Sequence, residues 1–418
     1  MRTQSTRTPE LLAPAGGLAQ LEAALRFGAD AVYLAADRFG LRQRAANFAL
    51  DDVPTAAALV HDAGAKAYVT LNALMDADDL KALPAYLEAL AAAGVDAFIV
   101  SDLGALRLAQ RYAPNVELHV STQASVCNAE AARVWHELGA SRVVCAREMS
   151  VEGIARLRAD APRELELEAF VHGAMCMAVS GRCLISAALT GRSGNKGHCT
   201  QPCRWSYALV EEQRPGEFFP VEEDVRGTYV MNAQDLNMLA HLDDLAAAGV
   251  DSFKIEGRNK KAFYVASVVR AYRLALDGVP ASELADELLA VSHRPYGTGF
   301  YYGDAQQSPD VDGYTAECRH AATVEACEPV AEGEFRVIAR CYNRFCEGDE
   351  LEALSPGPHV PLVRVRNLAW LPAPDGDDAQ PKRVPVAVAN RSAERYAFET
   401  GEELAPGDFL RMRINVER

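Results

Sequence analysis

The sequence predicts an α/β protein: a (β/α)8 TIM-like barrel with a cysteine-rich insertion, followed by a small C-terminal β-barrel domain. Short apolar segments alternate with stretches of helical period that are rich in alanine and leucine. Several of these segments begin with Gly-Ala-Asp or Gly-Val-Asp, as at Gly28, Gly94 and Gly249. From about Tyr314 the pattern changes to short segments in which apolar and polar residues alternate, as in antiparallel strands.

Eight segments have the composition of buried parallel strands. They begin at Leu11, Ala31, Ala67, Ala97, Glu117, Arg142, Leu167 and Phe253. Eight strands that alternate with helices over roughly 250 residues are typical of a closed barrel. The alternative, an open doubly wound sheet, needs a glycine-rich phosphate loop after the first strand. The segment PAGG at Pro14–Gly17 matches neither the dinucleotide nor the Walker pattern, which favours the barrel.

Helices are predicted between these strands. Segments 18–28, 54–64 and 83–94 carry apolar residues at helical spacing, and they end in Gly28, Gly64 and Gly94. Glycine is favoured just past a helix C-terminus because it adopts left-handed backbone angles without strain. These glycines therefore mark where three of the predicted helices end.

One segment interrupts the alternation. Residues 174–248 separate the seventh and eighth strands and contain four cysteines, one further helix and a possible hairpin of WSYALVEE with TYVMN. Insertions at the C-terminal rim of a barrel commonly carry function. We therefore expect a barrel domain over residues 1–313 that includes this insertion, and a β-barrel domain over residues 314–418. Its strands are expected at ATVEA, FRVIARCY, GDELEAL, VPLVRV, VPVAVA and GDFLRMRI.

The composition predicts a folded cytoplasmic protein with no membrane partner. Hydrophobic residues make up 49% of the 418 residues and charged residues 24%. No run of about 18 apolar residues is present, and the first ten residues lack the apolar stretch of a secretory signal. The formal net charge of −16 argues against a protein that coats nucleic acid by bulk attraction, although a local basic patch is compatible with it.

Four of the ten cysteines form an array with the spacing C-x6-C-x15-C-x3-C: Cys176, Cys183, Cys199 and Cys203. In a reducing cytosol, clustered cysteines indicate metal binding, redox chemistry or catalysis rather than disulfides. Thiolates select soft metals, so a 4Fe-4S cluster and zinc are the candidates, and the third possibility is that the thiols are buried and unligated. Spacing alone leaves these three readings open.

Polar residues follow the predicted strands, where a barrel places its active site. They are Asn72, Ser101, Asp102, Ser121, Gln123, Arg147, Glu148, His172, Glu256 and Arg258, with Arg42, Arg44 and Asn47 in the loop after the second strand. Several arginines facing one cavity suit a small polyanion, because guanidinium groups bind carboxylates and phosphates bidentately. His172 is placed for proton transfer just ahead of Cys176, and a structural role in the core is its alternative. We predict catalytic roles for His172, Glu256 and Arg258, and substrate binding by Arg42, Arg44, Asn47, Asn72, Gln123 and Arg147.

Seven motifs carry a resemblance to a known family. They are ELLAPAG at Glu10, GADAVY at Gly28, LRQRAANF at Leu41, VSTQASVCN at Val120, EAFVHGAMCMAVSGRCLIS at Glu168, CTQPCRW at Cys199 and KIEGR at Lys254. With them, the chain resembles the peptidase U32 family, and within it the branch of tRNA 5-hydroxyuridine modification proteins. The resemblance covers most of the chain, and the cysteine-bearing motif is the most specific part of it.

The resemblance implies a 4Fe-4S cluster on the four matching cysteines and oxygen-independent hydroxylation of the tRNA wobble uridine, with prephenate as the small-molecule hydroxyl donor. Related branches hydroxylate a ribosomal RNA cytidine or a ubiquinone precursor with the same cysteines, so the cluster does not identify the substrate. The loop after CRW is shorter than in some members, which leaves open whether a paralogous U32 subunit is also required.

Two other classes of function compete with a hydroxylase. The family name suggests a peptidase, yet the sequence contains neither HExxH nor GxSxG, so no nucleophile or zinc motif supports one. A non-enzymatic RNA-binding or scaffold protein would hold zinc in the four-cysteine site, and the many polar residues at the strand ends argue against it.

Overall fold

The computed structural model describes residues 8–41, 46–175, 183, 185–205, 208–209, 219–220, 234–305, 314–373 and 382–414. The chain divides into two compact units. The first comprises Met1–Leu25, Ala29–Lys261 and His293–Tyr314, and the second comprises Arg26–Gly28, Ala262–Ser292 and Thr315–Arg418. The second unit thus includes a helical segment, 262–292, that precedes the C-terminal strands, whereas the sequence prediction places its boundary at residue 314.

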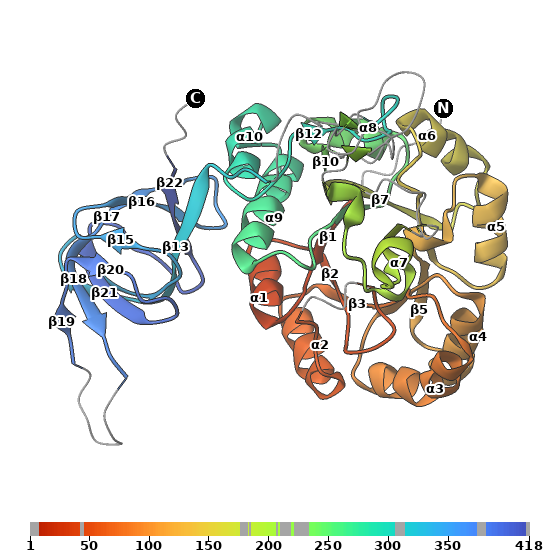
Figure 1. Ribbon diagram of the computed structural model, residues 1–418, viewed down its shortest axis with the longest axis horizontal. Coiled ribbons are helices and arrows are strands. Elements are labelled where there is room, and N and C mark those ends of the chain that lie inside the picture. The colour runs from red at the N-terminus through yellow and green to blue at the C-terminus, as the bar shows by residue number, and fades with distance from the viewer. Residues whose placement is uncertain are drawn as a thin grey trace. The chain divides into compact units, whose positions relative to one another are not determined.

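The first unit is built on a closed barrel of eight parallel strands (Figure 1). The strands are β1 (Glu10–Pro14), β2 (Ala31–Leu34), β3 (Lys66–Leu71), β4 (Ala97–Val100), β5 (Glu117–Val120), β6 (Arg142–Val144), β7 (Glu166–Ala174) and β11 (Ser252–Ile255). They pair in the order β11-β1-β2-β3-β4-β5-β6-β7, and the pairing of β11 with β7 closes the ring. The predicted (β/α)8 architecture is confirmed, because each predicted strand is present.

Helices surround these strands, as Figure 1 shows for α2 to α6. The helices of the first unit are α1 (Leu18–Arg26), α2 (Val53–Asp62), α3 (Ala77–Ala92), α4 (Leu103–Tyr112), α5 (Ala129–Glu137), α6 (Val151–Asp160) and α8 (Leu242–Ala247), of which α1 ends at the border of the two units. Gly64 and Gly94 follow α2 and α3 with φ of 76° and 82°, so these helices end where the sequence predicts. The barrel interior contains a cluster of buried residues: Leu12, Ala31, Tyr33, Tyr68, Ala97 and Ile99.

A short side sheet extends β7 beyond the barrel. Strand β10 (Asp235–Asn237) pairs antiparallel with the last residues of β7, and β12 (Tyr296–Gly297) pairs with β10. On its other side, β7 has an irregular register with β11: Phe170 is opposite Lys254, but His172 is opposite Ile255. One extra residue on β7 therefore shifts the side chains that follow it relative to the barrel.

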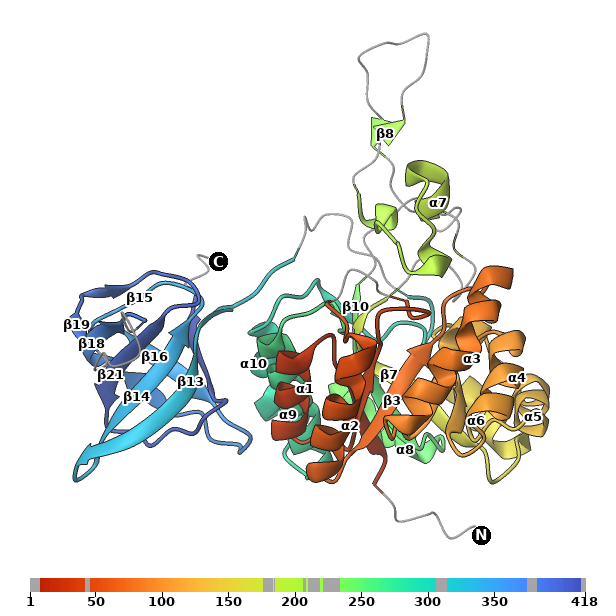
Figure 2. The ribbon, with the colours of Figure 1, turned by 90° about the horizontal axis from the view of Figure 1, so that it is seen from below.

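The described part of the insertion lies beyond the carboxyl ends of the strands (Figure 2). It contains α7 (Ile185–Thr190), two 3-10 turns at Gly194–Lys196 and Pro202–Arg204, and the antiparallel pair β8 (Ala208–Leu209) and β9 (Phe219–Pro220). The amide of Leu74, after β3, donates to the carbonyl of Asn195 at 2.8 Å, and Lys196 pairs with Asp76 at 2.5 Å. These contacts join the insertion to the strand-end face of the barrel. The TYVMN segment of the predicted hairpin lies outside the described residues.

The second unit combines two helices with antiparallel sheets. Helices α9 (Ala262–Leu276) and α10 (Ala281–Leu289) precede an eight-stranded sheet of order β17-β16-β22-β13-β14-β21-β18-β19 and a separate pair, β15 with β20. The strands are β13 (Cys318–Ala331), β14 (Glu334–Cys341), β15 (Phe345–Cys346), β16 (Glu350–Leu354), β17 (Leu362–Arg364), β18 (Arg366–Leu371), β19 (Val384–Pro385), β20 (Val388–Ala389), β21 (Arg395–Thr400) and β22 (Phe409–Arg413). Their inward side chains form one core that includes Val337, Phe345 and Phe398, so the predicted C-terminal β domain is confirmed.

Candidate functional site

A cavity opens at the carboxyl ends of the barrel strands. It encloses about 50 Å³, or about 460 Å³ when the open space at its mouth is counted. Its lining comes from nearly every strand of the barrel: Tyr33, Leu41, Thr70, Asn72, Ile99, Ser121, Thr122, Gln123, Val144, Arg147, Phe170, Lys254, Glu256 and Arg258. Five residues predicted from the sequence as site residues are among them, namely Asn72, Gln123, Arg147, Glu256 and Arg258.

Strand β11 and the loop after it supply three charged side chains to this cavity. Lys254, Glu256 and Arg258 alternate along the chain, so they share one face of the extended backbone, and all three line the cavity. Arg258 is 3% exposed and donates to the hydroxyl of Thr70 at 3.0 Å. The Lys254 ammonium lies 2.6 Å from Glu168 Oε1 and 4.5 Å from the centre of the Tyr33 ring. The sequence prediction missed Lys254, although the alternation in KIEGR was the signal for it.

Arg147 and Glu256 face each other across the cavity wall. Their closest nitrogen and oxygen are 3.7 Å apart, and the Arg147 guanidinium lies 3.9 Å from the centre of the Phe170 ring. Arg147 also donates to the carbonyl of Ala174 at 3.2 Å. The hydroxyl of Tyr33 donates to the Ile255 carbonyl at 2.9 Å and lies 3.4 Å from Glu256 Oε2. These contacts hold a cation and a carboxylate in fixed positions on one side of the cavity.

Amide and hydroxyl groups line the opposite side. The side-chain amide of Asn72 donates to Ser121 Oγ at 3.2 Å, and its oxygen accepts from the Leu41 amide at 3.2 Å. The Ser101 hydroxyl donates to the backbone carbonyl of Asn72 at 3.2 Å, and the backbone amide of Gln123 donates to Ser121 Oγ at 3.3 Å. The side is therefore polar but carries no formal charge, in contrast to the side formed by β7 and β11.

A buried layer of charge lies below the cavity. Arg142 is 3% exposed and pairs with Glu10 at 2.6 Å and with Glu168 at 3.2 Å, so Glu168 bridges Arg142 and Lys254. Burial acts to raise the pKa of Glu10, but the charge and hydrogen bonds of Arg142 outweigh it and lower that pKa below its usual value. Burial together with the nearby Glu10 carboxylate raises the pKa of Tyr68, whose hydroxyl donates to Glu10 at 2.7 Å. The floor of the cavity is thus a hydrogen-bonded ion network.

His172 does not line this cavity. The shift in register on β7 places it opposite Ile255, and its ring packs against Tyr296 with the centres 5.4 Å apart. Burial, together with the positive charges of Lys260 and His293, lowers the pKa of His172 to about 3, so the imidazole is neutral near pH 7. The next residue, Gly173, has φ of 104°, and a Cβ there would lie 2.6 Å from the Glu256 carbonyl. The predicted catalytic role of His172 stays a prediction.

The remaining predicted substrate contacts are in the loop after β2. Arg42 and Arg44 lie outside the described residues. Asn47 has φ of 51°, in the left-handed region that asparagine tolerates, and its amide donates to the Gly16 carbonyl at 2.8 Å. Its side-chain oxygen is buried and has no hydrogen-bond partner among the described residues.

Three of the four cysteines of the array are described, and Cys176 is not. Cys183, Cys199 and Cys203 are partly buried. The amide of Gln201 donates to Cys199 Sγ at 3.3 Å, and the Asn195 side chain donates to the Cys183 carbonyl at 3.1 Å. Thiols with an N–H···S contact fit the donor chemistry of an iron-sulfur cluster or of zinc. Within the described ranges, no group of three or more His, Cys, Asp or Glu residues is arranged to hold a metal ion, so the cluster stays a prediction.

Several other cysteines behave as buried apolar residues. Burial raises the pKa of Cys145 to about 12, and that of Cys318 and Cys341 to about 11. Thiols of this kind are poor nucleophiles near neutral pH.

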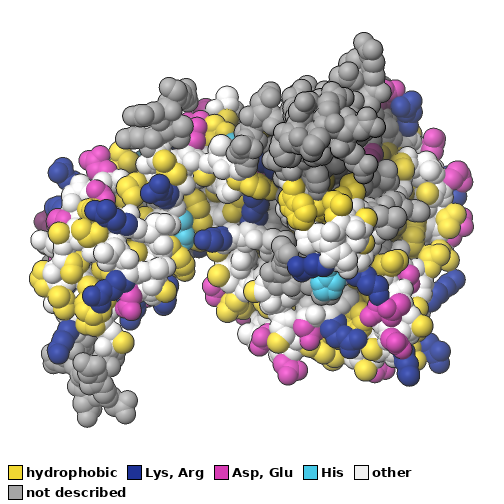
Figure 3. Space-filling model, in the orientation of Figure 1, with side chains coloured by type: hydrophobic (Ala, Val, Ile, Leu, Met, Phe, Trp, Pro, Cys, Tyr) yellow, Lys and Arg dark blue, Asp and Glu magenta, His cyan; other side chains and the backbone are white. Residues whose placement is uncertain are grey.

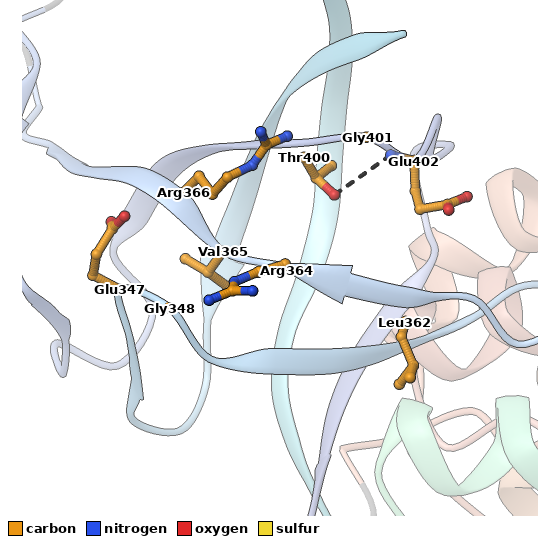
Figure 4. Close-up of a pocket in the computed structure, with 9 residues that line it drawn as sticks. All are labelled: Glu347, Gly348, Leu362, Arg364, Val365, Arg366, Thr400, Gly401 and Glu402. Atoms are coloured by element: carbon orange, nitrogen blue, oxygen red, sulfur yellow. Dashed lines mark hydrogen bonds between the residues drawn. The ribbon is translucent and has the colours of Figure 1, made fainter.

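A second hollow lies on the β sheet of the C-terminal unit (Figure 4). Its lining includes Arg364, Arg366, Thr400 and Glu402, and the Glu402 amide donates to the Thr400 hydroxyl at 3.4 Å. Arg366 is already paired with Glu334 at 2.5 Å. No predicted site residue lines this hollow, so the barrel cavity is the candidate active site.

On the face drawn in Figure 3, basic and acidic side chains are interspersed. None of the described helices combines the length and apolar composition that a membrane span requires.

Comparison with known proteins identifies the family. The model of peptidase family U32 matches residues 16–310. The "tRNA hydroxylation protein P1" of Bacillus subtilis is 34% identical over 416 residues, which cover 97% of this chain and 95% of that protein. The "23S rRNA 5-hydroxycytidine C2501 synthase" of Escherichia coli is 39% identical, and the alignment covers 66% of this chain and 40% of that protein. The "Collagenase" of Porphyromonas gingivalis is 33% identical, and the alignment covers 70% of this chain and 73% of that protein. With a family match over more than half of its length and a relative aligned almost end to end, the chain belongs to peptidase family U32.

Proposed function

We propose that this protein is an iron-sulfur-dependent enzyme that hydroxylates the wobble uridine of tRNA to 5-hydroxyuridine without molecular oxygen, with prephenate as the hydroxyl donor. The observation that carries the proposal is the row Lys254, Glu256 and Arg258 in a cavity at the strand ends, opposite a polar, uncharged side. The end-to-end similarity to a protein named for tRNA hydroxylation supports RNA as the substrate.

The charged side of the cavity suits a small dicarboxylic acid. Arg147, Lys254 and Arg258 place three cations around one space, and each is at least nine-tenths buried. Buried guanidinium and ammonium groups bind carboxylates strongly because little water competes with them. Prephenate carries two carboxylates, so this side of the cavity is where we place the donor.

The polar side of the cavity suits the edge of a nucleobase. Asn72 and Gln123 offer amide donors and acceptors, and Ser121 offers a hydroxyl. Phe170 and Tyr33 also line the cavity, where their rings lie against Arg147 and Lys254. An enzyme that modifies a base must take it out of its stack and hold its edge by hydrogen bonds, and this combination of groups is suited to that task.

Cys176, Cys183, Cys199 and Cys203 would hold the cluster. When bound, a 4Fe-4S cluster supplies electron transfer, or Lewis-acid binding if one iron has an open coordination site. The contacts from the insertion to Leu74 and Asp76 place Cys183 and Cys199 on a segment fixed to the rim of the barrel.

The test of the proposal is nucleoside analysis of tRNA from cells that lack the gene. Restoring the wild-type gene is expected to restore 5-hydroxyuridine, whereas Arg258→Ala and Cys176→Ala are expected to leave it absent. Arg156→Ala is the matched control, because Arg156 is a surface arginine on α6 with a 71% exposed side chain. If the Arg258 and Cys176 variants restore the nucleoside as well as wild type does, the proposal is wrong. Restoration in cells that also lack every other U32 gene would show that no paralogous subunit is needed.

The cofactor is tested separately on protein purified without oxygen. We expect about four irons and a similar amount of sulfide per chain, with broad visible absorbance, and their loss in Cys176→Ala. Zinc in place of iron would favour the scaffold reading instead.

The relatives with other names define the competing outcomes. A ribosomal RNA substrate would appear as an unmodified cytidine in the rRNA of the deletion strain while its tRNA stays normal. A peptidase, as the name of the Porphyromonas relative suggests, would cleave gelatin, and its activity would survive Cys176→Ala.

A further inference from the structure

Three rings form a stack in the C-terminal unit. His320, on β13, lies parallel to Phe263, the second residue of α9, with ring centres 5.3 Å apart and an interplanar angle of 13°. Tyr342, directly after β14, lies on His320 at 4.5 Å and 26°. Phe263 is 8% exposed, whereas Tyr342 is 43% exposed. The stack therefore begins in the core and ends in an aromatic ring at the surface.

The surface ring is held in place from several directions. Phe409 lies 5.2 Å from the His320 ring and 6.0 Å from the Phe263 ring. The amide of Tyr342 donates to the Ala321 carbonyl at 2.8 Å, and the Asn343 side chain donates to the His320 carbonyl at 2.8 Å. An exposed ring that is fixed in this way loses little conformational entropy when a planar partner stacks on it.

Two cations flank the stack in sequence. Arg319 precedes His320, and Arg344 follows Tyr342 by two residues; both are exposed. Neither forms an ion pair with any residue that the structure describes, whereas Arg340 pairs with Glu325 at 2.6 Å and Arg366 with Glu334 at 2.5 Å. An exposed arginine without an acidic partner is available to contact a phosphate.

We propose that Tyr342 is a stacking platform for an unpaired base of tRNA, with Arg344 contacting an adjacent phosphate. Single-stranded nucleic acid is commonly recognised by aromatic side chains that carry a base, together with cations that follow the backbone. A protein partner would instead favour a broader apolar patch around the ring, and the neighbours of Tyr342 in the chain, Asn343 and Arg344, are polar. The inference rests on the proposed function and extends it: the C-terminal unit holds the tRNA while the barrel acts on it.

The test is direct binding of unmodified tRNA to the full chain. Tyr342→Ala is expected to weaken binding by about 5- to 150-fold, which is the typical value of one stacked base, and Tyr342→Trp to preserve it. Tyr342→Leu keeps an apolar side chain but no ring, so it should resemble Tyr342→Ala. Tyr302→Ala is the matched control, because Tyr302 is 51% exposed in the other unit and its hydroxyl bonds to Asp244.

The arginines are tested by the salt dependence of the same measurement. Arg344→Ala should reduce the slope of log Kd against log salt by about one. Arg319→Ala is the matched control, because Arg319 precedes His320 on β13 and its side chain points to the other face of the sheet. If wild type binds tRNA but Tyr342→Ala and Tyr342→Leu bind equally well, the platform is wrong and the proposed function stands. If wild type itself binds no tRNA, the proposed function fails. Circular dichroism melts of each variant check that the fold is retained, and a ring-free variant whose Tm falls well below wild type is replaced by Tyr342→Gln.

Discussion

Two buried ion networks occupy the two units of this protein, and only one of them reaches a cavity. In the barrel, Arg142 and Lys254 share the carboxylate of Glu168, and Lys254 also lines the cavity. In the C-terminal unit, Arg411 binds Glu287 of α10 through two bonds of 2.7 and 2.9 Å and contacts Glu352 of β16 at 2.8 Å. Arg142 and Arg411 are both almost fully buried.

The difference teaches what each network is for. Burying charge is costly, and a buried ion pair is often no more stabilising than well-packed apolar residues. The network of Arg411 joins a helix to a sheet and lines no described cavity, so its role is to fix that packing. The network of Arg142 places an ammonium group at the floor of the candidate active site, so its cost is compensated by function.

The largest expected effect is on folding of the C-terminal unit. Arg411→Met leaves Glu287 buried without its main partner and should destabilise this unit by about 3–5 kcal/mol. Arg413→Met is the control, because Arg413 lies two residues further along β22, pairs with Glu352 at 2.6 Å and has a 51% exposed side chain. Urea unfolding followed by near-UV circular dichroism measures both. Equal effects of the two substitutions would contradict the structural role.

The next effect is on activity in the barrel. Lys254→Met keeps the length of the side chain but removes its charge from the cavity floor, and we expect tRNA hydroxylation to fall by about 100-fold. Glu168 keeps Arg142 as a partner at 3.2 Å, so the loss of stability should be smaller than for Arg411→Met. Lys66→Met, at the exposed start of β3, is the matched control. If Lys254→Met has normal activity but low stability, the barrel network has only a structural role, like that of Arg411.

The two units should also differ in their response to acid. Burial is the main cause that lowers the pKa of His119, and it lowers that of His172 to about 3, so His172 is neutral in the folded barrel between about pH 4 and 7 but protonates near 6.5 once unfolded. The unfolded state then binds more protons, and the barrel loses about 1.4 kcal/mol per histidine for each pH unit below 6.5. In the C-terminal unit, burial acts to raise the pKa of Glu352, but Arg411 and Arg413 outweigh burial and lower that pKa below its usual value. The stability that Glu352 contributes is therefore lost only below about pH 4.5.

Hydrogen exchange at pH 7.0 and 5.5, corrected for intrinsic rates, separates these responses. Barrel amides should lose protection at the lower pH while those of β13 and β22 keep it. His172→Gln should flatten the response of the barrel. Parallel losses in both units would show that the histidines do not control it.

The smallest effect tests geometry rather than charge. Arg258→Lys keeps a cation near Thr70 but removes the planar fork that binds a carboxylate with two bonds. We expect about a tenfold loss in kcat/KM for the donor, mostly through KM. Thr70→Val serves as a companion, because it removes only the hydroxyl that orients Arg258. An unchanged KM would place the donor elsewhere in the cavity.

The strands and most of the cavity were predictable from the sequence because they depend on local pattern. Eight apolar segments gave the barrel, and the rule that strand ends converge brought Asn72, Arg147 and Arg258 to one place. Strands β18 and β21 of the C-terminal sheet were not singled out, since RNLAWL and RYAFET mix charged and apolar residues less regularly.

What the sequence could not reveal depends on register and pairing. Lys254, Glu168 and Arg142 lie within apolar strands, and their partners are far apart in the chain, so nothing local marks them as one network. His172 follows Phe170 by two residues and would face the cavity in a regular strand. The irregular pairing of β7 with β11 moves it away, and a bulge of one residue leaves no clear trace in composition.

The pairing of β7 with β11 has a consequence for how this protein evolves. The two strands are neighbours in the barrel, yet Ala174 and Ser252 are separated by the whole cysteine-bearing segment. A long segment inserted between two neighbouring strands can be exchanged as a unit, since doubling the length of a flexible loop costs only about 0.6 kcal/mol. Evolution can therefore lengthen or trim this segment while the barrel cavity beneath it stays the same, and a chimera that swaps the segment between relatives should still fold.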